Sequence, residues 1–255
     1  MAITYNFLTR TEGCIVETQT DTPLKRSRLL YEGRSKRVYE TSDPDSVFIE
    51  FKTEFQQKNN DNDGPSKAEC AARVTEYVFK YLNSFRIPNH FMERRDTSEL
   101  HVRKMSMIPV AVVVRNFAYG SFCERFGLDE GTELEFPVVE LVYKNNQIGY
   151  PLVNETHILA FGVSTSTEMK TMQRIATKAN AVMRSFMERR GFRLIDMWLE
   201  FGRFEGEVLI GDALYPDSFR VQEIKSGDLY DGSLYRLEIG DYREEYTRLH
   251  DKLTA

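Results

Sequence analysis

The chain has 255 residues, of which 41% are hydrophobic, 29% charged and 12% aromatic, and its net charge at pH 7 is −5. This composition indicates a globular protein with enough chain for a sizeable core or for two subdomains. The acidic balance argues against a broad nucleic-acid surface, so an anion site has to be a local cluster of basic side chains. Because no apolar run approaches the length of a membrane span and the N-terminus lacks a signal-peptide pattern, we expect no membrane contact.

The three cysteines, Cys14, Cys70 and Cys123, are widely spaced and form no CxxC motif. Their odd number fits free thiols in a reducing compartment, so we expect a cytoplasmic protein. The four histidines are scattered along the chain and do not suggest a zinc site.

Residues 1–28 are mixed and polar, which predicts an N-terminal arm rather than core. Three short strands are predicted within 29–51, around a turn of sequence Gly33-Arg-Ser-Lys36 and a second turn at 43–45. We expect these strands to form an antiparallel meander. A glycine turn that carries Lys36 can lie over a phosphate chain, although basic hairpin tips are usually just solvated.

Residues 52–65 are polar and turn-rich, which predicts a mobile loop. The sequence from Ser66 to Glu69 is a capping box and predicts the start of a helix, which Pro88 stops. The buried face of this helix is predicted to carry Ala71, Val74, Val78, Tyr81 and Phe85. Two further strands are expected before residue 106.

The clearest stretch of the chain is the apolar run 110–114, which ends in Arg115 and Asn116. An apolar and β-branched run of this kind predicts a strand buried on both faces. At the end of such a strand Arg115 can offer a planar fork of donors to a phosphate or a carboxylate. Gly120 allows close backbone approach, and Ser121 adds a hydroxyl group. The alternative is a core strand whose terminal arginine makes a structural salt bridge.

A short helix that ends near Gly127 and a strand over 138–143 are predicted next. The loop that follows gathers Asn154, Glu155 and His157, which either line a site or cap the next element.

A second capping box, Thr165 to Glu168, predicts a long helix that ends at Gly191. Its core face is predicted to carry Met172, Ala176, Ala179, Met183 and Phe186. A last helix is expected over about 233–253.

Two paired strands in the last third of the chain carry most of the candidate chemistry. Asp196, Trp198 and Glu200 alternate along the first strand and share one of its faces, and Asp212 ends the second. Carboxylates on adjacent strands can hold Mg²⁺, a cation that prefers oxygen ligands near a phosphate. Alternatively, they are charges that face solvent on an open sheet. The turn that follows presents Arg220.

The order of these motifs resembles that of the SAICAR synthetase (phosphoribosylaminoimidazole-succinocarboxamide synthase) family over about residues 29–250. The motifs are LYEG, IPVAVVVRNFAYGS, PLVNETHI, LIDMWLEFGR, LIGDALYPDSFR and GDYREEY. The resemblance implies an α+β fold in which an antiparallel N-terminal sheet with a helix (29–107) joins a larger α/β part (108–255) across a cleft. It also implies a ligase that uses ATP and Mg²⁺ to join carboxyaminoimidazole ribonucleotide to L-aspartate. Family members are often dimers, so a homodimer is expected on the same ground.

The resemblance assigns the ribonucleotide side of this site to positions that the chain retains. In the family, a VVRNxAxGS strand and an SPDxxR turn grip the phosphate and the ring carboxylate. The matching residues here are Arg115, Asn116, Ser121, Asp217 and Arg220. Asn154 and Glu155 of the PLxNE motif and Arg236 of the late DKxxFR motif are also retained.

The ATP side matches less well. Gly33, Lys36 and Lys67 remain as candidate nucleotide contacts, and Glu200 and Asp212 as candidate Mg²⁺ ligands. The family turn GKAK has become GRSK, and the GKG ahead of the first long helix has become Ser66-Lys67-Ala68. Trp198 stands where DFKLEFG has a lysine, and Ala213 stands where GDE has a glutamate.

Two further departures lie in the same part of the family pattern. Tyr150 replaces an aspartate, and Gly232 replaces the lysine of DKxxFR. Because phosphoryl transfer depends on charge neutralisation and positioning, these changes predict a weakened ATP–Mg²⁺ site beside an intact ribonucleotide site.

Three functions therefore compete. The chain is a working synthetase, a paralogue with a retained imidazole or purine ribonucleotide site and altered chemistry in a nucleoside pathway, or a non-catalytic binding homologue. Trp198 is expected to face the cleft, where its indole offers a stacking surface for a base. The alternative is a tryptophan packed in the core under the sheet.

Overall fold

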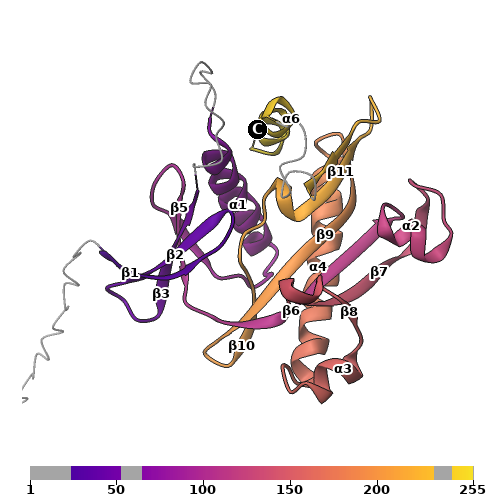
Figure 1. Ribbon diagram of the computed structural model, residues 1–255. Helices are drawn as coiled ribbons and strands as arrows, with labels where there is room; N and C mark the ends of the chain where they lie inside the picture. The colour runs from indigo at the N-terminus through magenta and orange to yellow at the C-terminus, as the bar shows by residue number, and fades with distance from the viewer. Residues whose placement is uncertain (1–23, 53–64, 233–242, 255) are drawn as a thin grey trace, which may run out of the picture.

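The computed structural model describes residues 24–52, 65–232 and 243–254. Most of the predicted N-terminal arm, the loop 53–64 and Arg236 lie outside the described residues. Within them the strands form two antiparallel sheets (Figure 1). No helix in this part of the chain is long and apolar enough to cross a membrane.

The N-terminal sheet has the strand order β1-β2-β3-β5-β4. The strands are β1 (Arg26–Glu32), β2 (Lys36–Thr41), β3 (Ser46–Phe51), β4 (Phe91–Arg94) and β5 (Glu99–Arg103). The first three pair in sequence, so the predicted meander is confirmed. The amide of Gly33 donates to the carbonyl of Lys36 at 2.8 Å and closes the predicted turn.

Helix α1 (Lys67–Ser84) packs on this sheet. The side chain of Ser66 accepts a hydrogen bond from the amide of Glu69 at 3.0 Å, as the capping sequence predicts. The predicted buried face is confirmed for its first three residues, and Tyr81 is half-buried. The prediction for Phe85 was wrong: this residue caps the C-terminus and its side chain is exposed, because the helix stops one residue before it.

The larger sheet has the order β12-β11-β9-β6-β7-β8, and β10 pairs with β9. Its strands are β6 (Ser106–Phe117), β7 (Glu133–Tyr143), β8 (Leu152–Val153), β9 (Phe192–Phe204), β10 (Glu207–Gly211), β11 (Phe219–Glu223) and β12 (Leu229–Asp231). Val110, Val112 and Val114 of β6 face the main core. Ala111 and Val113 point to the opposite face and are also buried. The prediction of a strand covered on both faces is confirmed.

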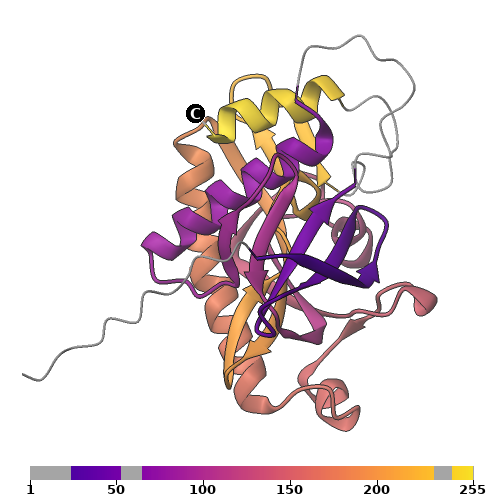
Figure 2. The same cartoon turned by 90° about the vertical axis from the view of Figure 1, so that its left-hand side faces the viewer.

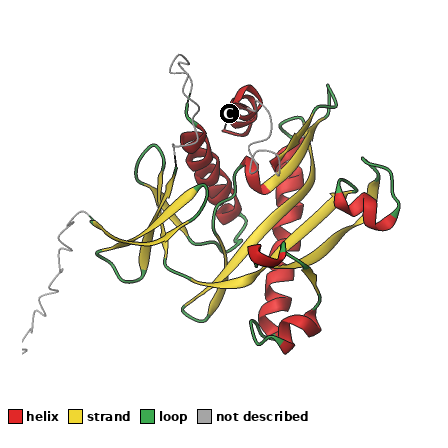
Figure 3. Cartoon of the chain, viewed as in Figure 1, coloured by secondary structure: helices red, strands yellow, loops and turns green. Residues whose placement is uncertain are grey.

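The long helix α4 (Ser166–Glu188) covers one face of this sheet, as Figures 1 and 2 show. Both halves of the predicted capping box are present between Thr165 and Glu168. All five residues predicted for its core face are buried. The other helices of the described residues are α2 (Ser121–Phe126), α3 (Glu155–Ala160) and α6 (Arg243–Thr254), with the 3-10 turns η1 (Asn146–Ile148) and η2 (Pro216–Ser218). Most of them lie at the ends of strands (Figure 3).

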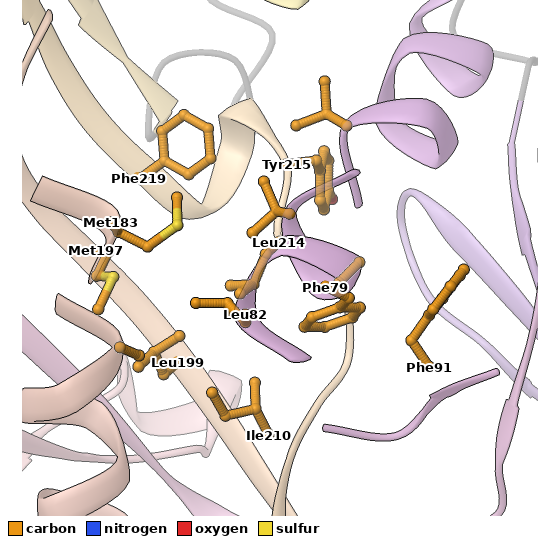
Figure 4. Packing of buried hydrophobic residues seen from close by; sticks show 14 of the residues in the cluster. Phe79, Leu82, Phe91, Met183, Met197, Leu199, Ile210, Leu214, Tyr215 and Phe219 are labelled. Carbon is orange, nitrogen blue, oxygen red and sulfur yellow. The ribbon is translucent and has the colours of Figure 1, made fainter. Parts of the chain in front are cut away.

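One hydrophobic cluster joins the two sheets. Figure 4 shows Phe79 and Leu82 of α1 in one cluster with Leu199 and Ile210 of the larger sheet. The predicted division between residues 107 and 108 falls inside β6, near the start of this strand. The sheets before and after it share one hydrophobic core.

The N-terminus of α4 is held to β9 by Glu168 and Arg203. The Nε of Arg203 donates to one carboxylate oxygen of Glu168, and Nη2 donates to the other at 3.0 Å. Glu168 also accepts from the backbone amide of Thr165 at 2.8 Å. Arg203 holds the pKa of the Glu168 carboxyl at about 2, with the Thr165 amide helping against partial burial.

We predict that Glu168→Ala lowers the free energy of unfolding by about 1–2 kcal/mol at neutral pH, because a cap and a half-exposed ion pair are lost together. The pKa of Glu168 is depressed in the folded state, so its stabilisation is complete above the pKa of an unfolded glutamate, about 4.3, and disappears as pH falls towards 2. Urea unfolding across this range should show the two proteins converging in acid. Glu188→Ala, at the exposed far end of the helix, is the control. A difference that stays constant with pH would contradict the assignment.

Candidate functional site

A cavity of about 210 Å³ opens on the face of the larger sheet that lies opposite α4. β6, β7, β9, β11 and the start of α2 contribute to its lining. Five candidates from the sequence lie in it: Arg115, Ser121, Trp198, Asp217 and Arg220. These residues come from three separate stretches of the chain, around 115–121, 198 and 217–220, and the sheet brings them together.

A row of alternating charges crosses the sheet at the polar end of this cavity. Arg115 of β6 is the register partner of Asp196 on β9. Asp196 is in turn the partner of Arg220 on β11, and Arg220 is the partner of Asp231 on β12. Directly opposed residues of antiparallel strands have neighbouring side chains, so the row places positive and negative groups in sequence across four strands.

Arg115 is fixed by two carboxylates. Its Nε donates to Glu140 at 2.6 Å, and its Nη1 donates to Asp196 at 3.0 Å. Arg125 of α2 donates to the other oxygen of Glu140 at 2.7 Å. The predicted salt bridge is therefore present, but it does not remove Arg115 from the site, because a guanidinium has five N–H donors and the side chain still lines the cavity.

Arg220 is held more loosely. Its Nε lies 3.4 Å from Asp231 and 3.9 Å from Asp196, and within the described residues this buried nitrogen has no hydrogen-bond acceptor. Gly120 adopts a φ of 57°, and a Cβ there would lie 3.4 Å from Nη1 of Arg220. A glycine at this position thus gives both the left-handed turn and the close approach of the guanidinium. A guanidinium held this loosely beside a cavity is suited to an anionic ligand.

Asp196 lies between the two arginines. Burial raises the pKa of its carboxyl above the usual range, although Arg220 and Arg115 oppose this effect.

The other end of the cavity is apolar and aromatic. Trp198 is half-buried and packs against Ala111, Val113 and Val142. The ring of Tyr150 lies at 87° to the Trp198 ring, with 6.2 Å between centroids. The indole Nε1 donates to Glu200 at 3.2 Å. Trp198 therefore lines the cavity and is not packed in the core under the sheet.

Three other ribonucleotide candidates are placed elsewhere. Asn116 points to the α4 face, where its side chain exchanges hydrogen bonds of 2.8 and 2.9 Å with Asn180. Asn154 caps α3 in a reciprocal capping box with His157. Glu155 accepts from Ser166 at 2.7 Å. The sequence left open whether this loop lines a site or caps the next helix, and in the structure Asn154 and His157 form a helix cap.

The candidates for the ATP side form a second polar cluster next to the cavity. Lys36 pairs with Asp212, and Lys144 pairs with Glu200. Against the effect of burial, Asp212, then Tyr215 and then Glu200 hold the pKa of Lys36 above its usual value. Against burial as well, Lys36 and then Lys144 hold the pKa of Asp212 below its usual value. Two lysines and two carboxylates therefore compensate one another.

Further contacts join this cluster to the rest of the site. The backbone carbonyl of Asp212 lies 2.7 Å from Nε2 of His90, and burial lowers the pKa of His90 to about 4, so its ring is neutral at pH 7. Nζ of Lys67, at the start of α1, lies 3.3 Å from Asp217 in the cavity. Gly33 accepts at its carbonyl from Lys52 at 3.2 Å.

The donor set does not fit a resident Mg²⁺ well. Glu200 and Asp212 each have a lysine ammonium as ion-pair partner, and the described residues contain no group of three or more side chains able to hold a metal. A hard cation prefers several uncommitted oxygen ligands, and here it would compete with both lysines. The structure thus disagrees with a metal site built on these two carboxylates.

Sequence reasoning missed several contributors, among them Glu140, Arg125 and Lys144. The register partner of Arg115 on β7 is Val138, and Glu140 lies two residues further along that strand. Only the pairing of the two strands, and no sequence motif, could have pointed to Glu140. In the sequence, Tyr150 stood out only because it replaces an aspartate of the family pattern. In the structure its ring lines the aromatic end of the cavity.

Comparison with known proteins gives matches over nearly the whole chain. A family model described as SAICAR synthetase matches residues 29–253. A phosphoribosylaminoimidazole-succinocarboxamide synthase from Clostridium acetobutylicum is 34% identical over 234 residues, which cover 91% of this chain and 100% of that protein. The crystal structure of the Ehrlichia chaffeensis synthase of the same name has a TM-score of 0.80 at 30% identity, covering 89% of this chain and 99% of that one. A SAICAR synthetase in complex with ADP has a TM-score of 0.78 at 34% identity, covering 88% and 97%.

We predict that Asn116→Ala destabilises the fold without weakening ligand binding. Removing one side of the buried amide pair leaves Asn180 without its partner and should lower the free energy of unfolding by about 1–3 kcal/mol. Asn180→Ala is the matched control, and the double variant should cost less than the sum of the two. Calorimetric titration of the folded Asn116→Ala variant with 5-aminoimidazole ribonucleotide should match the wild type; a weaker affinity would return Asn116 to the binding site.

Proposed function

The chain belongs to the SAICAR synthetase family, and from this premise we propose that it is an enzyme that binds an aminoimidazole ribonucleotide in the cavity of the larger sheet. We further propose that it acts on this ligand in nucleoside or nucleotide biosynthesis without the ATP-dependent coupling of aspartate. The free thiols of the buried Cys70 and Cys123 support a cytoplasmic setting.

The observation that carries the proposal is the convergence of Arg115 and Arg220 on one cavity. They come from β6 and β11 and flank Asp196, and the buried Nε of Arg220 has no acceptor in the described residues. Ser121 adds a hydroxyl group to the same lining. Two guanidinium groups and a hydroxyl suit a phosphate, which accepts charge-assisted hydrogen bonds from several directions.

The altered chemistry is supported by the charges of the neighbouring cluster. Nucleotide triphosphate and Mg²⁺ need cations that face phosphate oxygens and carboxylates that face the metal. Here Lys36 and Asp212 are committed to each other, as are Lys144 and Glu200. The position of the family lysine is taken by Trp198, which brings bulk and no charge.

Gly232 supplies a steric argument in the same direction. A Cβ built at this glycine would overlap the backbone carbonyl oxygens of Pro216 and Phe219. The η2 turn therefore lies against Gly232 and leaves no room for the lysine found there in the family. Backbone atoms cannot yield as the end of a flexible side chain can.

The second candidate function is the family ligation itself. It is favoured by the match to full-length synthases at 34% identity and by the presence of Lys36, Lys67, Glu200 and Asp212. In that case ATP–Mg²⁺ would have to separate both lysine–carboxylate pairs on binding.

We predict that Arg115→Ala weakens binding of 5-aminoimidazole ribonucleotide at least about tenfold, because a charge-assisted contact contributes about 1.5–3 kcal/mol. Calorimetric titration measures the affinity. Arg174→Ala, an arginine on the exposed face of α4, is the control and should leave it unchanged. Equal affinities for a folded Arg115→Ala variant and the wild type would remove the phosphate assignment.

We also predict that the protein releases no ADP above background when it is given ATP, Mg²⁺, L-aspartate and carboxyaminoimidazole ribonucleotide. The reason is that Trp198 and Ala213 stand where the family pattern has a lysine and a glutamate, so charges needed for phosphoryl transfer are missing. A coupled ADP assay with the Clostridium acetobutylicum synthase as positive control makes the measurement. ADP release at a rate similar to the control would establish the second candidate function instead.

A further inference from the structure

We propose that Trp198 and Tyr150 form a base-binding corner in the cavity, oriented by Glu200, and that the ligand is a nucleoside 5′-monophosphate with a flat, uncharged ring. The inference rests on the proposed function for the phosphate end, and it concerns the opposite end, where the chain departs from its family.

The register of β6 and β9 sets the distance between the two ends. Arg115 opposes Asp196, and Val113 opposes Trp198 two residues along each strand. Two residues of a strand span roughly 6.6 Å, from a rise of about 3.3 Å each. A ribose can bridge this length, so a phosphate at the arginines leaves the base beside the indole.

The two aromatic rings meet nearly at a right angle. At 87° and 6.2 Å between centroids they do not leave a slot between parallel faces, but they form a corner. A planar ring placed in this corner packs its face on one ring and its edge on the other, both of which are favourable aromatic geometries. Val142 and Leu152 complete the apolar surround.

Glu200 fixes the orientation of the indole. Its carboxylate accepts from Nε1 of Trp198 at 3.2 Å and is paired with Lys144 on its other oxygen. This gives Glu200 a positioning role in place of the metal-ligand role suggested by the family pattern. The two contacts of Glu200, with Lys144 and with Trp198, thus hold the indole side of the corner in place.

The chemistry of this end selects against a charged ring. Its lining residues from the described chain are Val113, Val142, Tyr150, Leu152 and Trp198, and the nearby ammonium of Lys144 is committed to Glu200. A ring carboxylate placed here would give up part of its hydration without gaining a cation. An uncharged imidazole or purine ring loses little hydration free energy in this position and gains stacking contacts with the aromatic side chains.

The test is a ligand series measured by titration calorimetry and by the fluorescence of Trp198, the only tryptophan in the chain. The probes are ribose 5-phosphate, 5-aminoimidazole ribonucleotide, its 4-carboxylate and inosine 5′-monophosphate. We expect the two ligands with uncharged rings to bind at least about tenfold tighter than ribose 5-phosphate, since stacking contributes about 1–3 kcal/mol per base. They should also quench the emission saturably, and the 4-carboxylate should bind more weakly than its uncharged parent.

Variants separate the corner from the phosphate end. Trp198→Ala should remove the advantage of the ring and leave the affinity for ribose 5-phosphate nearly unchanged. Trp198→Phe keeps an aromatic face and should retain part of the advantage, which also guards against a folding defect in the alanine variant. Glu200→Gln keeps an acceptor for the indole and removes the ion pair with Lys144, so it should retain most of the ring contribution. Glu200→Ala removes the acceptor as well and should lose more of the ring contribution, without any dependence on Mg²⁺.

The outcomes distinguish the two proposals. If ribose 5-phosphate binds as tightly as the nucleotides, or if the 4-carboxylate binds tightest, the corner is refuted while the phosphate site stands. If Trp198→Ala and Trp198→Phe weaken all four ligands equally, the tryptophan has only a structural role and the corner is again refuted. If none of the four ligands binds to the wild type, the proposed function fails together with the corner.

Discussion

The row of charges across the larger sheet is the interaction on which the site depends. Arg115, Asp196, Arg220 and Asp231 are successive register partners on β6, β9, β11 and β12. Arg115 is fixed by two carboxylates before a ligand arrives, whereas Arg220 is held more loosely between Asp231 and Asp196. In the proposed binding of a phosphate, the preorganised donors of Arg115 need little reorganisation and stabilise an anion more than mobile donors do. The same register places Trp198 and Glu200 further along β9, where the character of the cavity changes from polar to aromatic.

Much of this arrangement was predictable because it follows from local patterns. The apolar run of β6 indicated a strand buried on both faces, and alternation along β9 put Asp196, Trp198 and Glu200 on one side. The two capping boxes located the starts of α1 and α4. The sequence did not reveal the partners that come from other strands, such as Glu140 for Arg115 and Lys144 for Glu200. Those contacts depend on register, which a single strand does not encode.

Alternation also explains the placement of Asn116. Arg115 and Asn116 belong to one sequence motif, which suggests a shared role. However, adjacent residues of a strand point to opposite faces of the sheet. Arg115 faces the cavity, and Asn116 faces α4, where Asn180 satisfies it. A retained motif residue can therefore be retained for the fold alone. The same reasoning applies to Asn154, whose side chain caps α3.

The tryptophan at position 198 accounts for the contacts that Glu200 and Lys144 make beside it. The resemblance assigns a lysine to the position of Trp198, and the indole present here needs an acceptor when it is partly buried. Glu200 supplies that acceptor, and Lys144 then balances the carboxylate. A carboxylate used in this way is a poor metal ligand, because metal binding would break both contacts at once. One substitution thus links the aromatic wall of the cavity to the pairing of Glu200 with Lys144, and the two features need not have separate causes.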